Sequence, residues 1–289
     1  MKNTRSKTPI PKPKPCLLKE LLVHLHIGKS GGTSLDPLLF NISKERKSCF
    51  LGFHHFDWTL INQMTYYEKV DVLTLLRNPT SRSISHFHYA KKLPWTEEFP
   101  VFRNETLDEY LHDPKTMLQT RDVWQDGMAS VAWLTGTHTA NWIVGDLEEE
   151  QLLRREWLAQ NHTRMLTLAA DRLEKTLWFG LLEDTPRSME LLRHSFNLSD
   201  TPPLQKANNA NETHEPPSDW TKRALASLTP QDHWLYEYAQ QLFEARWNAY
   251  TTGTFIQPLR PPFPKIPCIS SRHHIECRSG PLDGLKYYL

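Results

Sequence analysis

An apolar strand that runs straight into a glycine-rich loop constrains the fold of this chain more than any other feature. In Leu21–Ile27, one face of a strand would carry Leu21, Val23, Leu25 and Ile27, and His24 and His26 share the other face. The loop GKSGGTS, residues 28–34, follows at once. A strand that leads through glycines into a helix is typical of an anion-binding α/β unit.

The glycine loop does not have the Walker pattern of ATP- and GTP-binding proteins. That pattern, G-x-x-x-x-G-K-[ST], requires a glycine five residues before Gly28, where this chain has Val23 inside the predicted strand. Gly31 and Gly32 follow Lys29 instead of preceding it. The sequence therefore predicts a phosphate site of a different geometry.

A second apolar strand ends in the same way. Val70–Leu76 is followed by RNPTSRSISHFHYAKK, which begins with the basic residue Arg77. The repeated order of strand, loop and helix predicts an α/β fold with a central parallel sheet flanked by helices, whose ligands gather outside the carboxyl ends of the strands. Both loops are thus expected at one edge of the sheet.

Cap and period signals predict the remaining elements. An acid and a proline, Asp36-Pro37, fit the first turn of the helix after the glycine loop. The other expected elements are a helix starting near Thr106, a helical segment 169–176, a strand 177–182, a helix from Thr185-Pro186 to about Phe196, and a long helix from Thr229-Pro230 with Leu235, Tyr238, Ala239 and Leu242 on its apolar face.

Length and composition predict one domain with appendages. The 289 residues divide into a disordered, basic, proline-rich lead-in (1–19), a domain (20–250) and a tail without assignment (251–289). Lys+Arg 34 against Asp+Glu 33 gives a net charge of +1, which does not indicate a nucleic-acid partner. The lead-in lacks a signal peptide's apolar core, and no apolar run of about eighteen residues indicates a transmembrane helix.

Two further sequence features bear on the compartment. Cys268 and Cys277 could close a small loop in the tail. Five N-glycosylation triplets begin at Asn41, Asn104, Asn161, Asn197 and Asn211.

Five segments, in order, resemble the sulfotransferases that use 3′-phosphoadenylyl sulfate (PAPS). They are HIGKSGGTS, CFLGFHHFDWTL, LLRNPTSRSISHF, LWFGLLEDTPRSMELLRHSFNL and LYEYAQQLFEARW. They are most similar to heparan-sulfate 6-O-sulfotransferases and also similar to plant-type tyrosylprotein sulfotransferases, over roughly residues 21 to 250. The resemblance implies a P-loop-like sulfotransferase fold, PAPS as co-substrate, and an anionic glycan or another hydroxyl-bearing acceptor.

The resemblance also implies which residues hold the donor. Sulfuryl transfer requires a cation at the departing bridging oxygen, and Lys29 stands at that place in the motif. The 5′-phosphosulfate loop would comprise Lys29, Ser30, Gly31, Gly32, Thr33 and Ser34, and no metal is expected. Arg77 and Ser85 would hold the 3′-phosphate, with Arg82 either helping or only supporting the loop. Asn78 stands where the family usually has Asp.

The catalytic base falls on one of two adjacent histidines. His55 matches the family's H-x-D-W frame when counted back from Asp57 and Trp58, and Asp57 would orient its ring. His54 remains the alternative base, because three extra residues separate Cys49 from His55 relative to the family. A polar loop that includes Lys206 stands where the family has a nucleotide lid.

The sequence also permits other interpretations of its histidines and of its function. A metal site would need the pairs His24-x-His26 and His86-x-His88 to converge with His54, His55 and Asp57, but no recognised metal spacing supports it. His86, His88, Lys91, Lys92 and Trp95 form a basic-aromatic stretch that suits either an anionic glycan or a solvated helix face. Tyrosine sulfation, an ATP-dependent kinase and a non-catalytic glycan-binding relative are the other functions considered. Family resemblance favours the Golgi lumen, although members usually carry a membrane anchor and none is visible here.

Overall fold

The computed structural model describes residues 18–52, 57–91, 105–112, 129–136, 161–204, 216–264, 268–271, 274–277 and 287–288. Its centre is a parallel sheet of β1 (Glu20–Leu25), β2 (Cys49–Leu51), β3 (Lys69–Leu76) and β4 (Trp178–Leu181). The strand order is β2-β1-β3-β4, and every neighbouring pair is parallel. The predicted α/β class with a central parallel sheet is confirmed.

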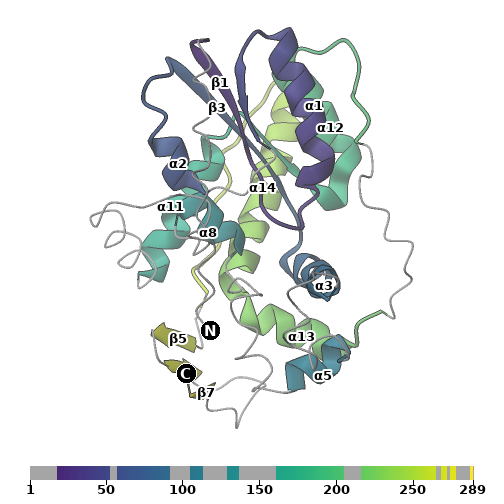
Figure 1. Ribbon diagram of the computed structural model, residues 1–289, viewed down its shortest axis with the longest axis vertical. Coiled ribbons are helices and arrows are strands. Elements are labelled where there is room, and N and C mark those ends of the chain that lie inside the picture. The colour runs from purple at the N-terminus through teal and green to yellow at the C-terminus, as the bar shows by residue number, and fades with distance from the viewer. Residues whose placement is uncertain are drawn as a thin grey trace, which may run out of the picture.

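Helices cover both faces of this sheet, as Figure 1 shows. On one side lie α1 (Gly32–Glu45) and α12 (Thr185–Phe196), and on the other lie α2 (Trp58–Asn62), α8 (Ala129–Thr135) and α11 (His162–Glu174). The long α14 (Pro230–Thr252) packs against β4, α11 and α12. Because β1, β4 and the second half of β3 are buried on both faces, cover by helices on both sides is the stable arrangement.

The first helix starts earlier than the sequence predicts. Gly31, at φ 87°, adopts the left-handed conformation and serves as N-cap, so α1 begins at Gly32. The pair Asp36-Pro37 therefore lies in the second turn, and the expected place in the first turn was wrong. A proline there leaves one helical hydrogen bond unmade. Asp36 is 1% exposed and faces the sheet, which α1 covers.

Most other boundaries agree with the cap signals. Thr229 is the N-cap of α14 and Pro230 its first residue, as predicted. A helix does follow Thr106, α5 (Leu107–His112), and Glu109 bonds back to the Thr106 amide in a capping box. For α12 the N-cap is Asp184 rather than the expected Thr185, because the Asp184 carboxylate accepts from the Arg187 amide.

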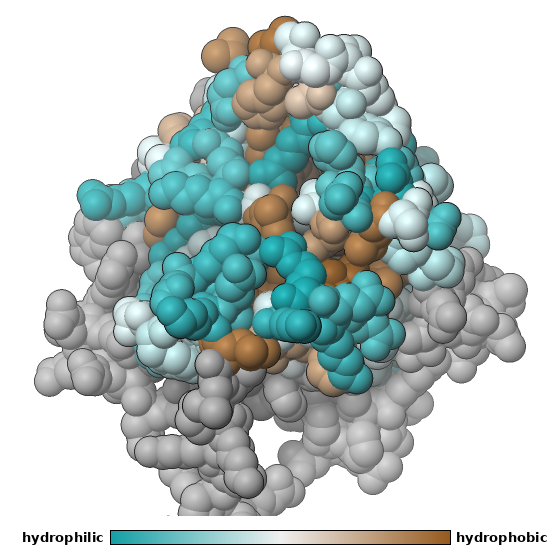
Figure 2. All heavy atoms as spheres, turned by 90° about the horizontal axis from the view of Figure 1, so that it is seen from above, coloured by the Kyte–Doolittle hydropathy of each residue, from teal (hydrophilic) through white to brown (hydrophobic). Residues whose placement is uncertain are grey.

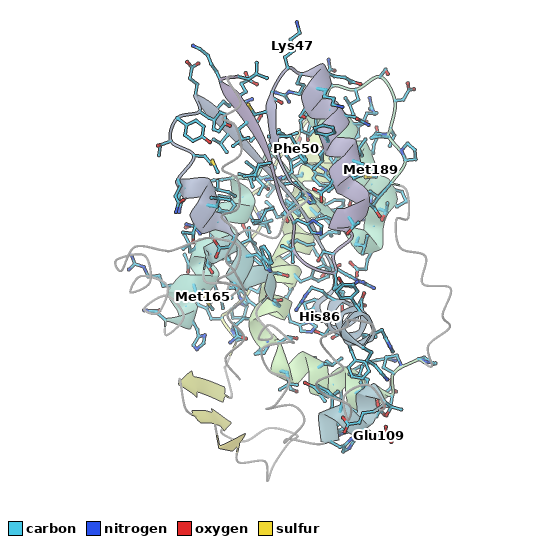
Figure 3. All side chains as sticks on the ribbon, in the orientation of Figure 1. Lys47, Phe50, His86, Glu109, Met165 and Met189 are labelled. Carbon is cyan, nitrogen blue, oxygen red and sulfur yellow. The ribbon has the colours of Figure 1, made fainter. Side chains whose placement is uncertain are left out.

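Below the sheet, a second apolar cluster joins α3 (Pro79–Ala90), α5 and α13 (Asp219–Leu228) around Phe87, Tyr110 and Leu225. Figure 1 shows these three helices together at the end of the molecule toward which β3 runs. Lys47 lies at the opposite end, and His86 lies on α3 (Figure 3). This cluster fixes α3 close to the carboxyl ends of the strands.

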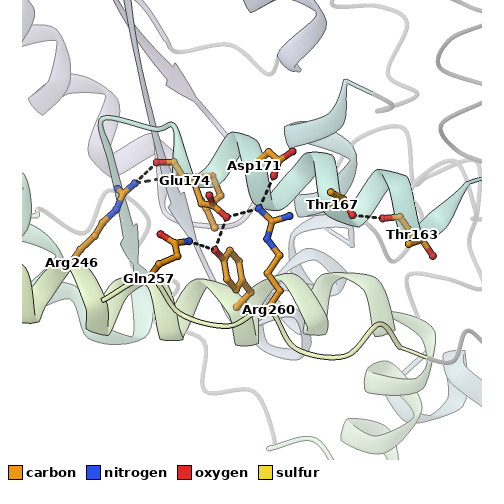
Figure 4. A network of polar contacts seen from close by, with 9 residues as sticks. Thr163, Thr167, Asp171, Glu174, Arg246, Gln257 and Arg260 are labelled. Carbon is orange, nitrogen blue, oxygen red and sulfur yellow. Dashed lines mark hydrogen bonds and ion pairs between the residues drawn. The ribbon is translucent and has the colours of Figure 1, made fainter. Parts of the chain in front are cut away.

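Residues 254–264 continue along α14 after it ends at Thr252. The Trp234 indole donates to the Pro261 carbonyl at 2.9 Å, and Arg260 bonds Asp171 and Glu174 of α11, each at 2.6 Å. Figure 4 shows Arg260 joining this segment to α11. Farther on, β5 (Cys268–Ser271), β6 (His274–Cys277) and β7 (Tyr287–Tyr288) form a small antiparallel sheet in which Cys268 and Cys277 are opposite each other.

Viewed from above, the end of the molecule that carries the amino ends of the strands has mainly hydrophilic residues with apolar ones between them (Figure 2). Among the described residues, no helix combines the length and the hydropathy of a membrane-crossing segment.

Candidate functional site

The glycine loop forms a strained turn between β1 and α1. Lys29 has φ 64°, a left-handed conformation that residues with a side chain rarely adopt, and Gly31 follows at φ 87°. Ser30 lies between them with 1% of its surface exposed, and its hydroxyl oxygen has no partner in the described part of the chain. A buried hydroxyl without a partner, beside amides at a helix N-terminus, is the arrangement that an anion would satisfy.

The second loop meets the first directly. Arg77, at the end of β3, donates through Nη1 to the Lys29 carbonyl oxygen at 3.2 Å. Burial lowers the pKa of Arg77, and the nearby Glu183 carboxylate opposes that shift. Glu183 in turn accepts from the Asn78 amide at 3.0 Å. The prediction that both loops lie at one edge of the sheet is confirmed.

Helix α3 completes this side of the site. The Lys29 ammonium lies 4.1 Å from the centre of the Tyr89 ring, so an aromatic residue of α3 holds the loop lysine. Ser85 is half-buried on the same helix. Asn78 caps α3 by accepting from the Ser81 amide at 3.1 Å. Asn and Asp cap helices about equally well, so the departure from the family's Asp preserves this role.

Arg82 lies in the core instead of in the loop. Its side chain is 3% exposed, and its Nη2 lies 3.6 Å from Asp232 Oδ2 of α14. Asp232 also accepts from the amides of Ser130 and Val131, both at 3.0 Å. Burial lowers the pKa of Arg82 and raises that of Asp232, while each charge partly offsets the other's shift. Arg82 therefore joins α3 to α14 through Asp232, and its contact with the 3′-phosphate stays a prediction.

The segment expected to carry the base is described only in part. Asp57 is 1% exposed and caps α2 by accepting from the Thr59 amide at 2.9 Å. The Arg172 guanidinium lies 5.0 Å from the centre of the Trp58 ring. His54, His55 and Lys206 lie outside the described residues, as do Lys92 and Trp95. His86 and His88 are half-buried on α3, and the Lys91 ammonium donates to the Glu105 carbonyl at 2.7 Å.

Sequence reasoning missed one residue next to the loop. Asp36 bonds His24 Nδ1 at 2.6 Å and His26 Nδ1 at 2.9 Å, and all three side chains are buried. Of the histidine pairs considered for a metal, His24 and His26 thus meet at Asp36. The signal was available in the helix period, because Asp36 shares the buried face of α1 with Gly32, Leu35 and Leu39. A carboxylate on a buried face needs a polar partner.

Comparison with known proteins finds distant relatives that are named as sulfotransferases. No family model matches the chain. Heparan-sulfate 6-O-sulfotransferase 2 of Gallus gallus is 24% identical to it over 79% of this chain and 68% of the relative. Heparan-sulfate 6-O-sulfotransferase 1 of Mus musculus is 24% identical over 79% of this chain and 67% of its own length. The human 6-O-sulfotransferase 3 is 24% identical over 80% of this chain and 59% of its own length.

These relatives share one activity in their names, and the identity extends over about four fifths of the chain. The similarity to these relatives supports the sulfotransferase family and no specific member of it, and the α/β fold with a central parallel sheet is consistent with that family.

Proposed function

We propose that this protein transfers the sulfuryl group of PAPS to a hydroxyl group of an anionic glycan. The distant relatives are heparan-sulfate 6-O-sulfotransferases, which supports sulfotransferase activity. PAPS as donor, a histidine base and the 6-O position of a heparan-sulfate-like chain are our proposals for this chain.

One observation carries the proposal, namely the junction of the two loops. The Arg77 guanidinium bonds the backbone of Lys29, so a residue assigned to the 3′-phosphate and a residue assigned to the phosphosulfate belong to one connected site. Ser30 adds a buried hydroxyl without a partner in the described residues. A nucleotide with phosphate groups at both its 3′ and 5′ positions has anions for both loops.

The proposed chemistry needs one sulfuryl transfer and one proton transfer. The acceptor hydroxyl oxygen forms a bond to sulfur while the bond from sulfur to the bridging oxygen breaks. Lys29 would stabilise the negative charge that grows on that departing oxygen, which leaves on adenosine 3′,5′-bisphosphate. His55 would take the proton of the acceptor hydroxyl, with His54 as the alternative base.

The acceptor is assigned by class. The names of the relatives specify heparan sulfate, and His86 and His88 lie half-buried on α3, the helix that carries Ser85. We propose that the substrate is a glycan with acidic groups, and that its 6-O position is the favoured site of sulfation. Protein tyrosine is the alternative acceptor of the same reaction.

The compartment is likewise a proposal. We infer that the chain works in the lumen of the secretory pathway, in the Golgi. Cys49 is disulfide-bonded, and disulfides persist in oxidising compartments. Among the described residues, three glycosylation triplets begin at exposed asparagines, Asn41, Asn161 and Asn197. Both observations fit the lumen.

A thermal-shift experiment tests the donor assignment. Adenosine 3′,5′-bisphosphate without metal should raise the Tm of the wild-type protein, and Lys29→Ala and Arg77→Ala should reduce that shift. ATP with Mg²⁺ is run beside it. Stabilisation by ATP with Mg²⁺ alone would overturn the proposal in favour of a kinase.

The structure already weighs against the kinase. A P-loop nucleoside triphosphatase has a metal-binding Asp at the end of the strand beside its phosphate loop. Here Arg77 occupies that end of β3. The strand's only acid, Asp71, stands near its opposite end, where it pairs with Lys69 at 2.8 Å and lies 3.7 Å from Arg46.

A further inference from the structure

A single buried carboxylate connects two histidines directly below the glycine loop. Asp36 Oδ1 lies 2.6 Å from His24 Nδ1, and Asp36 Oδ2 lies 2.9 Å from His26 Nδ1. The two rings stack with their centres 5.3 Å apart and their planes 20° apart. An ionised carboxylate only accepts hydrogen bonds, so each ring must present its proton on Nδ1. We refer to these three residues as the Asp36 clamp.

The environment sets the charges within the Asp36 clamp. Burial by itself raises the pKa of Asp36, but hydrogen bonds from His24 and His26 outweigh it and the net pKa is lowered. Burial lowers the pKa of His24, more than its contact with Asp36 raises it. At neutral pH the carboxylate is therefore ionised and the His24 ring is neutral. Its Nε2 atom is buried and has no partner among the described residues.

Two histidines and a carboxylate also have the chemistry of a metal site. Their candidate ligand atoms all lie within 4.8 Å of one another. In a tetrahedral zinc site with bonds of about 2.0–2.1 Å, ligand atoms from different residues would stand about 3.3 Å apart. The observed separations of 2.6 and 2.9 Å are those of charge-assisted hydrogen bonds. The geometry therefore favours shared protons over a shared metal.

The clamp touches the phosphate loop through His26. A Cβ atom placed on Gly32 would lie 2.3 Å from His26 Cδ2 and 2.4 Å from His26 Nε2, so the backbone of Gly32 rests on the imidazole ring. Gly32 is the first residue of α1, where the helix amides face the loop. The position of the His26 ring thus determines how close α1 and its amides come to β1.

The clamp also lies beside Gly52, the residue that follows β2. A Cβ on Gly52 would lie 2.7 Å from Asp36 Oδ1. Gly52 directly precedes the segment 53–56, which contains His54 and His55. Asp36 therefore contacts the backbone before the base and, through His26, supports the backbone of the phosphate loop.

From this arrangement we propose that Asp36 is a positioning residue, which locks both histidines in the Nδ1–H form and thereby sets the phosphate loop in its anion-binding shape. The consequence for nucleotide binding rests on the proposed function, whereas the tautomer does not. The proposal makes the shape of the phosphate loop depend on the protons at Nδ1 of His24 and His26, which lie outside the loop.

Histidine nitrogen spectra of the full chain test the tautomers. In ¹⁵N-histidine protein, long-range ¹H–¹⁵N spectra should show Nδ1–H rings for two residues, identified by their loss in His24→Gln and His26→Gln. In Asp36→Asn, which keeps the side-chain volume, an amide N–H replaces one acceptor, so at least one ring should change to Nε2–H. Wild-type rings in the Nε2–H form, or ring signals that shift when Zn²⁺ alone is added, would overturn the proposal.

Binding of adenosine 3′,5′-bisphosphate tests the positioning, with variants compared at a temperature where circular dichroism shows both folded. Asp36→Asn should weaken binding about 10- to 100-fold, the loss expected when a positioned group moves by about 1 Å. Asp71→Asn is the matched control, since Asp71 pairs with Lys69 at the other end of the sheet, and it should bind like the wild type.

The positioning role of Asp36 and the proposed function can be disproved separately. If the wild type binds the bisphosphate and Asp36→Asn binds it equally well, the positioning role is wrong and the proposed function stands. If the wild type does not bind it, the proposed function is wrong, and the nitrogen spectra alone decide whether the Asp36 clamp exists.

Discussion

At the scale of single residues, a substitution of Ser30 is expected to affect ligand binding but not the stability of the free protein. Its hydroxyl is buried without a partner in the described chain, so it contributes no hydrogen bond to the free protein. We expect Ser30→Ala to leave the free protein as stable as the wild type, or up to about 1 kcal/mol more stable. The same change should reduce the Tm increase caused by adenosine 3′,5′-bisphosphate.

Ser188 is the matched control for that experiment. Its buried hydroxyl donates to the Leu181 carbonyl at 3.0 Å and accepts from the Leu181 amide at 2.8 Å. Ser188→Ala should therefore lower stability by about 1–3 kcal/mol, because it leaves a buried amide unpaired, while the bisphosphate-induced shift persists. A Ser30→Ala variant that loses stability just as Ser188→Ala does would contradict the anion-binding role of Ser30.

The buried histidines make stability depend on pH. Burial lowers the pKa of His24, His162 and His233 below the ordinary 6.5. Below pH 6.5 the unfolded chain takes up protons that the folded rings refuse, so stability must fall as pH falls, by at most about 1.4 kcal/mol per pH unit for each histidine. Burial raises the pKa of Asp232 above the ordinary value of 3.8. This carboxyl group therefore has the opposite effect, and makes the folded protein more stable as pH falls toward that range.

Urea unfolding at pH 7.5 and pH 6.0 measures this dependence in the range where histidine dominates. The unfolding free energy should be lower at pH 6.0, and His24→Gln, whose amide can still donate to Asp36, should make the difference smaller. A free energy of unfolding that rises toward pH 6.0 would show that these rings are protonated in the folded protein.

At the scale of elements, the Arg82–Asp232 pair joins three helices. Asp232 of α14 accepts from the first amides of α8 and lies 3.6 Å from Arg82 of α3. Asp232→Ala should lower the free energy of unfolding by about 3–5 kcal/mol, because it leaves the Arg82 charge buried alone. The exposed Asp219 provides the control, since Asp219→Ala should change it by less than about 1 kcal/mol.

Hydrogen exchange shows whether the loss of Asp232 destabilises helices α3 and α8 or only the Arg82–Asp232 pair. Amides of α8 and α3 should exchange faster in Asp232→Ala than those of β1, which carries neither residue of the pair. A uniform loss of protection, or none, would mean that Asp232 does not tie these helices together.

Element boundaries show what sequence patterns can predict. The period of β1 and β3 and the Thr229-Pro230 start of α14 were predictable because each depends on neighbouring residues, whereas the N-cap of α12 is Asp184, one residue before the expected Thr185. The three-residue β2 was not predicted, since so short a strand has no period of its own. Pro37 misled the prediction of the first turn, because the start of α1 depends on the left-handed Gly31.

At the scale of the whole molecule, the site's loops were predictable and their partners were not. The place of Lys29 and Arg77 followed from the rule that parallel strands gather their ligands at one edge. The pairing of Asp36 with His24 and His26 depends on how α1 crosses β1, and the burial of Arg82 depends on α14, some 150 residues later. Such contacts arise from packing between distant segments.

The central claim is that these assembled loops transfer a sulfuryl group. The most direct measurement follows ³⁵S from labelled PAPS to a heparan-sulfate chain that lacks 6-O-sulfate, with a tyrosine peptide beside it, in the wild type and Lys29→Ala. We predict label on the glycan, no requirement for added metal, and a loss of rate of about 100-fold or more in Lys29→Ala. Label on the peptide alone would reassign the acceptor, and label on neither, with PAPS bound and intact, would contradict the account.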